Sequence, residues 1–378
     1  MTTTAPEPTL TVEPTDGSDL EAAIGELAMK IAVSAIGAFE LATIELGMRL
    51  GLYAALADEP ATPPQLAERA GIDARYAREW LEQQTTSGLV DIVASPVDGD
   101  ADKRIFALPV ATAACLLDPN SLACVAPLAT FASAGPAILP ELETAYRTGA
   151  GLSFAAYGEW IRKAQSAGNR PQFTNLLVQE WLPTMPDVVT RLQRPGARVA
   201  DVGSGCGWSS IALARGFDGL TVDGYDSDED SISRARRNAG EHGVSDRVSF
   251  EVRDLAAVAA GGAQYDLVTF FECVHDLSHP VRALAAARDA LRPGGVVLVM
   301  DENIDEELVA PGDEVQRFFA AASVIWCTPQ GRVEEDSEVV GTVMRPEKMR
   351  ELAMAAGFSA VDTVPIAHPF WRFYRLTP

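Results

Sequence analysis

The spacing of apolar residues along the chain changes near residue 197, and this change limits the folds that the sequence can adopt. From there to the C-terminus, short runs rich in Val, Leu and Phe alternate with segments of helical period, which is the pattern of a parallel sheet covered by helices. Seven runs have the length and composition of strands: RVADVGS, LTVDGYD, VSFEVRD, YDLVTFF, VVLVMDE, AVDTVPI and WRFYRL. We therefore predict an α/β domain with a mostly parallel, seven-stranded sheet over residues 193–378.

The N-terminal part of the chain has a different pattern. Residues 1–19 are rich in Thr and Pro, and we expect a disordered tail. A long segment of helical period follows. Next come signals for a helix, a break at Gly71, a second helix capped by Asp73, a stop at Gly88 and two short strands. This order is typical of a winged helix, so we assign residues 20–119 to a mainly α-helical, winged-helix-like dimerisation domain.

Residues 120–192 are predicted to form a helical connector that is rich in aromatic side chains. Several of these side chains lie close to glycines in SFAAYGEW and RPQF, which suits a lid over an apolar ligand. Phe154, Tyr157 and Trp160 are the candidates for contacts with such a ligand. Packing in the core is the alternative explanation for each of them.

Charge and composition exclude several classes of partner. The formal net charge is −23, which repels nucleic-acid phosphates and anionic lipid headgroups, and the winged-helix segment has no basic face. We found no basic and apolar leader and no apolar run of about 20 residues, so we expect no membrane partner. The five cysteines are scattered without C-x-x-C spacing, which fits a reducing cytoplasm.

Three predicted strand ends carry the groups that bind a nucleoside. The first strand runs into Asp201-Val202-Gly203-Ser204-Gly205-Cys206-Gly207, where glycines let a ligand approach the backbone and a helix N-terminus follows. The second strand ends at Asp226, about 20 residues further on, where an acid can meet ribose hydroxyls. The third ends at Asp254, which can receive an adenine amino group. Because the loop holds no Lys or Arg, a cofactor without phosphates is favoured over NAD.

With these motifs, residues 197–378 resemble the class I S-adenosylmethionine-dependent methyltransferases, which have a Rossmann-like sheet. The winged-helix segment together with RTGAGLSFAAYG and HDLSHP is similar to small-molecule O-methyltransferases with an N-terminal dimerisation domain. The resemblance implies a homodimer, S-adenosylmethionine as cofactor and a small, largely apolar acceptor. The cofactor-binding residues that it implies are Asp201, Gly203, Gly205, Gly207, Asp226, Ser227, Asp254, Leu255 and Phe271.

The fourth predicted strand is followed by a segment rich in acids and histidines, FFECVHDLSHP. The resemblance implies that His275 removes the acceptor's hydroxyl proton, and a neutral imidazole suits that task near pH 7. Asp301 and Glu302 end the fifth strand, where one of them can orient the imidazole; the sequence does not decide between them. Glu272 and His279 are weaker candidates for acceptor contacts. His275 as a helix-start residue, with methyl transfer by proximity alone, is the alternative.

Other functions remain open at this point. The acids and histidines of this segment could hold a metal, but Pro280 interrupts the H-x-x-x-H spacing and we expect none. The acceptor atom could be sulfur, nitrogen or carbon instead of oxygen, or the cofactor could serve a reaction without methyl transfer. A winged-helix transcriptional regulator that senses a nucleoside is the alternative of another class.

Overall fold

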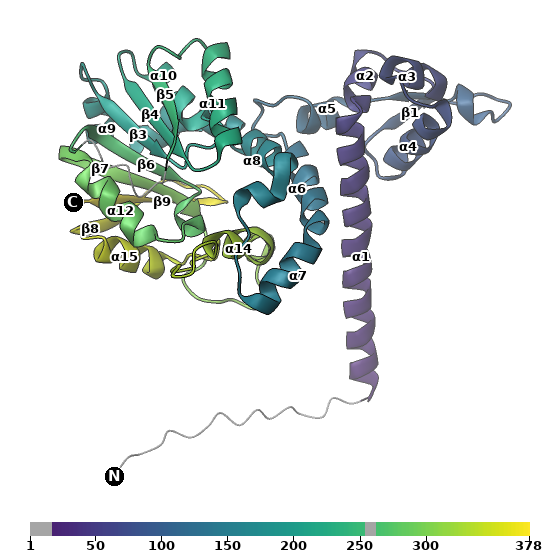
Figure 1. The fold of residues 1–378 in the computed structure, drawn as a ribbon. Helices are drawn as coiled ribbons and strands as arrows, with labels where there is room; N and C mark the ends of the chain where they lie inside the picture. The colour runs from purple at the N-terminus through teal and green to yellow at the C-terminus, as the bar shows by residue number, and fades with distance from the viewer. Residues whose placement is uncertain (1–16, 254–261) are drawn as a thin grey trace.

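The computed structural model describes residues 17–253 and 262–378. A winged-helix region on a long N-terminal helix is joined through a helical connector to an α/β sheet domain (Figure 1). The predicted cofactor residues Asp254 and Leu255 lie outside the described residues, as does most of the predicted tail.

Seven strands form the large sheet, in the order β5-β4-β3-β6-β7-β9-β8. Neighbouring strands from β5 to β7 run parallel, and β9 is antiparallel to both of its neighbours. All seven predicted strands are confirmed, although the fifth begins earlier than predicted. Their bounds are β3 (Arg198–Val202), β4 (Thr221–Asp226), β5 (Val248–Val252), β6 (Tyr265–Phe271), β7 (Leu291–Glu302), β8 (Ala360–Val364) and β9 (Trp371–Thr377).

Alternate residues of the central strands supply two apolar cores, one on each face of the sheet. Val199 and Leu267 belong to one core, whereas Ala200 and Val268 belong to the other. The strands are buried on both faces, as expected for parallel strands covered by helices. The helices that pack there are α9 (Pro186–Leu192), α10 (Trp208–Gly216) and α11 (Glu229–Glu241) on the first face, and α12 (Pro280–Asp289) and α15 (Pro346–Ala355) on the second.

The connector is helical, as predicted, and it reaches the carboxyl ends of the strands. Its main helix continues directly into a π-helical segment that packs on α10. A second group of short helices, from the part of the chain after β7, lies beside it (Figure 1). The elements are α6 (Ala126–Ala137), α7 (Leu139–Thr148), η2 (Phe154–Tyr157), α8 (Gly158–Gln172), η3 (Phe173–Trp181), η4 (Leu182–Thr184), η6 (Val274–Asp276), α13 (Glu314–Ala322), η7 (Ser323–Cys327) and α14 (Thr328–Gly331).

The winged-helix elements form where the turn and cap residues predict them. Gly71 and Gly88 both have positive φ, and the Asp73 carboxylate accepts hydrogen bonds from the first backbone amides of the second helix. The arginines of that helix face acids: Arg75 pairs with Glu79 and Arg78 with Asp102. The elements are α2 (Leu52–Asp58), α3 (Pro63–Ala70), α4 (Ala74–Thr86), β1 (Asp91–Ala94), η1 (Ala101–Lys103), β2 (Ile105–Ala107) and α5 (Val110–Leu116).

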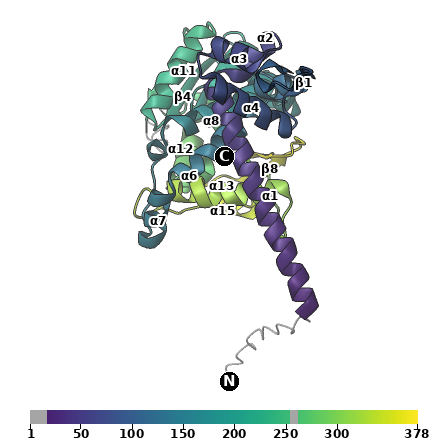
Figure 2. The same ribbon diagram turned by 90° about the vertical axis from the view of Figure 1, so that its right-hand side faces the viewer.

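The N-terminal helix α1 (Gly17–Arg49) stands away from the rest of the chain over much of its length (Figures 1 and 2). Large apolar side chains are exposed along it, among them Ile24, Ile31 and Phe39, whose exposed fraction is 75%. By length and composition alone, residues 18–49 could also cross a membrane, because one 18-residue window within them has a mean hydropathy of 1.6. The expectation that no apolar run reaches that length is therefore wrong, because the few charges of α1 lie far apart.

Candidate functional site

A cavity of about 450 Å³ lies at the carboxyl ends of β3, β4 and β6. Open α/β sheets bind ligands at this edge, because loops diverge there and leave a crevice. The glycine loop after β3, the end of β4 and the segment after β6 line the strand side. Helix α8 and the start of α12 line the opposite side.

The glycine loop owes its shape to backbone conformations that other residues rarely adopt. Gly203, Gly205 and Gly207 all have positive φ. A Cβ on Gly203 would lie 2.7 Å from the Cys273 side chain, and one on Gly207 would lie 2.5 Å from the Phe250 ring. Gly203 and Gly205 line the cavity, whereas Gly207 begins α10 behind them. The loop thus lets main chain form one wall of the cavity.

Asp201 lies beneath this loop and is 1% exposed. Its Oδ2 accepts hydrogen bonds of 2.6 Å from the hydroxyls of Ser209 and Ser210, and its Oδ1 accepts one of 2.8 Å from Thr269. The carboxylate therefore fastens β3 to α10 and β6. In this structure Asp201 holds the loop that lines the cavity and does not line the cavity itself.

Asp226 lines the cavity at the end of β4, and Ser227 follows it. Each carboxylate oxygen accepts one backbone hydrogen bond, Oδ2 from the amide of Gly205 at 2.8 Å and Oδ1 from that of Asp228 at 2.9 Å. Burial raises the pKa of Asp226 to about 6, although these hydrogen bonds act in the other direction. The second lone pair of each oxygen remains available to a ligand.

The connector closes the cavity through a buried ion pair. Arg162 of α8 donates to Asp228 through Nε at 2.7 Å and through a second guanidinium nitrogen at 2.9 Å. Both side chains are less than 10% exposed, and Asp228 also accepts from the amide of Ser231, where it caps α11. This bidentate contact fixes α8 against the end of β4.

The three predicted aromatic contacts lie in different places. Phe154 lines the cavity. Tyr157 is buried in a small core of the connector and donates its hydroxyl to the carbonyl of Ile325. Trp160 is exposed, with the Arg49 guanidinium 3.6 Å from the centre of its ring. Of the predicted aromatics, the structure therefore brings Phe154 and Phe271 together at the cavity.

The segment after β6 forms the far end of the cavity. Glu272 lines it with a φ of 54°, a strained conformation for a residue other than glycine, and its amide donates to the carbonyl of Met300. Burial raises the pKa of Glu272 to about 8. His279 also lines the cavity, and its Nε2 lies 3.0 Å from the exposed carboxylate of Glu334.

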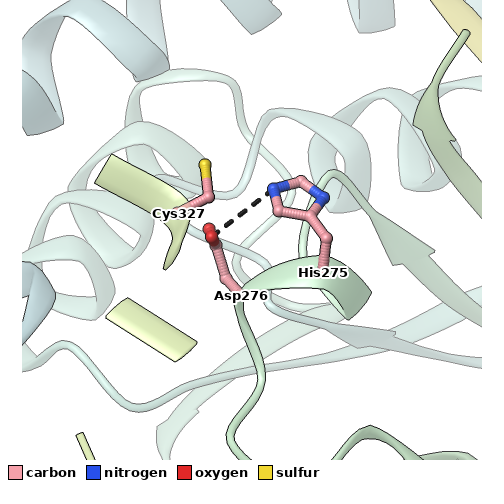
Figure 3. A group of neighbouring side chains, drawn as sticks. All are labelled: His275, Asp276 and Cys327. Carbon is pink, nitrogen blue, oxygen red and sulfur yellow. Dashed lines mark ion pairs between the residues drawn. The ribbon is translucent and has the colours of Figure 1, made fainter. Parts of the chain in front are cut away.

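His275 is buried behind Asp276, whose side chain lines the cavity (Figure 3). Its Nδ1 lies 2.8 Å from Oδ1 of Asp301 and 3.0 Å from Oε2 of Glu302, so both predicted acids contact the same nitrogen. Because Nδ1 donates to Asp301, the other nitrogen, Nε2, is directed to Asp276, 3.5 Å away. The ring is therefore oriented with Nε2 toward the cavity side.

Proton occupancy differs among these buried groups. Burial lowers the pKa of His275, but the neighbouring carboxylates outweigh this effect and raise it well above its usual value. The pKa of Asp301 is lowered despite its burial, because it faces the imidazole. Burial and the adjacent Asp301 raise the pKa of Glu302 well above its usual value. At neutral pH we therefore expect an imidazolium, an Asp301 carboxylate and a neutral Glu302.

The cavity also contains residues that the sequence did not single out. Ser166 and Asn169 line it from the face of α8 that also carries Arg162, and Cys273 lines it from the other side. The only local signal for the α8 residues was the helical period, which places residues three and four positions apart on one face. Which face meets the strand ends depends on the connection between the two domains, and no short motif encodes that.

Comparisons with known proteins agree with this geometry. Residues 199–295 match a family described as a methyltransferase domain, and residues 38–117 match a family described as an Rv2258c-like winged HTH domain. A ubiquinone biosynthesis O-methyltransferase of Dinoroseobacter shibae is 28% identical over 167 residues. That match spans 44% of this chain and 62% of the relative, which is less than two thirds of the relative's length.

Two solved structures resemble nearly the whole chain. The mitomycin 7-O-methyltransferase MmcR has a TM-score of 0.64 at 21% identity, over 96% of this chain and 99% of the other. The structure of PigF with S-adenosylhomocysteine has a TM-score of 0.69 at 19% identity, over 93% and 99%. Identities this low show a shared fold. Together with the two family matches, they confirm the predicted fold, a Rossmann-like sheet domain of the kind found in methyltransferases behind a winged helix.

Proposed function

We propose that this methyltransferase, with its N-terminal winged-helix domain, moves the methyl group of S-adenosylmethionine to a small acceptor, most readily to an oxygen atom. The observation that carries the proposal is one continuous cavity. The glycine loop and Asp226, which suit a nucleoside, lie at one end of it, and an oriented histidine lies behind the other end.

The cofactor fits the strand side of the cavity. The lone pairs left on Asp226 suit the two ribose hydroxyls, and the main chain of Gly203 and Gly205 allows close approach of the methionine part. The Phe271 ring packs against that of Phe173 with centres 5.3 Å apart, which offers an apolar wall. S-adenosylmethionine supplies a methyl group on a sulfonium that needs no further activation.

His275 is the proposed base. The acceptor oxygen attacks the methyl carbon, the carbon–sulfur bond breaks with its electron pair on sulfur, and Nε2 of His275 takes the hydroxyl proton. Asp301 holds the ring through Nδ1 and stabilises its positive charge afterwards. Because a positive charge in the cavity lowers the pKa of His275, we expect the neutral ring in the loaded cavity.

The proposed assembly is a homodimer that covers α1. An apolar helix with Ile24, Ile31 and Phe39 exposed is unfavourable in water, and a second copy of α1 offers a matching surface. We expect Phe39→Asp to convert a dimer into a monomer, measured as molar mass by light scattering. A wild-type monomer would contradict the assembly, and binding to lipid vesicles instead would assign α1 to a membrane.

The free cysteines fit a cytoplasmic location.

The experiment that tests the function is a panel of phenols, thiols and amines, assayed for release of S-adenosylhomocysteine together with the methylated product. We expect turnover with at least one phenol. Turnover with thiols or amines alone would move the acceptor atom away from oxygen. Cofactor binding without turnover of any acceptor, or conversion of an acceptor without S-adenosylhomocysteine, would contradict methyl transfer.

A further inference from the structure

Three unlike side chains meet behind the acceptor end of the cavity. His275 and Asp276 come from η6, and Cys327 is the last residue of η7. Figure 3 shows the imidazole facing the carboxylate, with the Cys327 side chain beside them. One ligand atom from each of the three, a nitrogen, an oxygen and the sulfur, lies within 4.8 Å of the other two.

The distance between His275 and Asp276 is informative. Nε2 and Oδ1 are 3.5 Å apart, which is longer than the usual 2.7–3.2 Å of a hydrogen bond between nitrogen and oxygen. Nitrogen and oxygen ligands of one tetrahedral zinc, with bonds of about 2.0–2.2 Å, are separated by ~3.3 Å. The pair therefore has the spacing of two ligands of a common ion.

Buried oxygens around the same histidine lack hydrogen-bond donors. Among the residues that the structure describes, Oδ1 of Asp276 and Oδ2 of Asp301 have no hydrogen-bond partner. Buried polar atoms without partners are rare in native proteins, and a missing ion or water is one of their causes.

The outer contacts of His275 have the form found at zinc sites. Its Nδ1 donates to Asp301 at 2.8 Å, which is the carboxylate–histidine arrangement that fixes the tautomer and aims the other nitrogen at a metal. Imidazole, carboxylate and thiolate together are a donor set that suits zinc. Asp276 lines the cavity, so the fourth position of a tetrahedral ion would face the acceptor.

We propose that His275, Asp276 and Cys327 bind one zinc ion, and that the bound ion stops methyl transfer. On binding, the Cys327 thiol and any Nε2 proton are released to solvent, and both atoms donate their electron pairs to the ion. Nε2 is then unable to accept the acceptor's proton. The binding site stands on its own geometry, whereas the inhibition rests on the function proposed above.

Binding is tested without any acceptor. Chelator-treated full-length protein is titrated with zinc chloride by calorimetry and with cobalt chloride by absorption spectroscopy. We expect one ion per chain and a thiolate-to-cobalt charge-transfer band. Cys327→Ser should remove the band and weaken zinc binding by more than the ~10–100-fold that loss of an outer partner costs, and Asp301→Asn should fall in that range. Cys124→Ser, at the start of the connector just before α6, is the matched control and should change neither.

Cobalt binding to the wild-type protein without the band would overturn the site, whether or not the Cys327→Ser variant folds. Equal zinc affinity in wild type and Cys327→Ser would overturn it as well. For inhibition, zinc should lower the turnover of an acceptor found in the panel, and a chelator should restore it. In Cys327→Ser, the ratio of turnover with zinc to turnover without zinc should stay close to one, whatever the metal-free turnover of the variant is. Turnover that rises with zinc would overturn inhibition. Zinc binding in a protein without methyl transfer would contradict the proposed function alone.

Discussion

In the cofactor half of the cavity, made by residues 203–205 and Asp226, the shape comes mostly from the main chain. In the acceptor half, made by residues 272–279, it comes mostly from side chains, among them Glu272, Asp276 and His279. Both halves lie at the carboxyl ends of neighbouring strands, β3 and β6. The comparison shows that one edge of a sheet can combine two kinds of surface. The main-chain half suits a nucleoside, and the half with ionisable side chains can change its protonation when a ligand binds.

The largest expected effect is on the acceptor half. His275→Ala should lower turnover by ~10²–10⁴-fold, because it removes the base. The cofactor dissociation constant, measured by calorimetry, should change little. His279→Ala is the control from the same segment, and its effect should be smaller, because His279 faces the exposed Glu334. Equal losses in the two variants would remove the distinction between the two histidines.

The next effect belongs to the cofactor half. Asp226→Ala should weaken S-adenosylmethionine binding by ~10–100-fold, because hydrogen bonds to a charged acceptor contribute about 1.5–3 kcal/mol. Turnover at saturating cofactor should stay close to that of wild type. Asp218→Ala replaces an exposed acid of the loop before β4 and should leave affinity unchanged. Unaltered affinity in Asp226→Ala would refute the ribose contact.

A smaller effect is expected in the pH dependence of cofactor affinity, which reports on Asp226 in the cofactor half. The pKa of Asp226 is about 6, and the ribose hydroxyls prefer its ionised form, so cofactor affinity should fall by about tenfold between pH 7 and pH 5. The stability of the free protein should depend on pH in the opposite direction. Because the folded protein holds the Asp226 carboxyl protonated, the contribution of this group to the free energy of unfolding declines as pH rises from about 4 to 6. Calorimetry at several pH values should show the dependence, and Asp226→Asn should abolish it.

The smallest effect concerns the main-chain wall itself. Gly207→Ala should destabilise the protein by ~1–3 kcal/mol, because φ is 82° and a Cβ would meet the Phe250 ring. Gly205→Ala also has a positive φ, but a Cβ there has open space around it among the described residues, so its melting temperature should fall less. Equal melting temperatures would show that the Phe250 contact adds nothing.

The sequence predicted best what is encoded locally. Strand period, the glycines at positive φ and the acid at the end of β4 are properties of a few consecutive residues, and the structure has all of them in the expected order. The same local pattern does not distinguish residues that line the cavity from residues that support the loop beneath it. Asp201 carries the right residue type at the right spacing, but the hydroxyls of Ser209 and Ser210 hold it beneath the loop.

Contacts between segments that are far apart in the chain could not be predicted from the sequence. The meeting of Cys327 with His275, and that of Arg162 with Asp228, depend on how the connector and the part of the chain after β7 fold over the sheet edge. Trp160 shows the same limit, because its neighbour Arg49 comes from the end of α1. No spacing rule relates such residues, since their proximity is set by packing between domains.

The ion pair between Arg162 and Asp228 also affects how fast the cavity can exchange its contents. Widening the cavity between α8 and the end of β4 separates two buried charges, and breaking a buried pair costs about 3–5 kcal/mol. A free-energy cost of that size keeps the open form rare, between roughly one molecule in 150 and one in 5,000. The residence time of a bound molecule then depends on how often α8 separates from the end of β4, as well as on the contacts of the molecule itself.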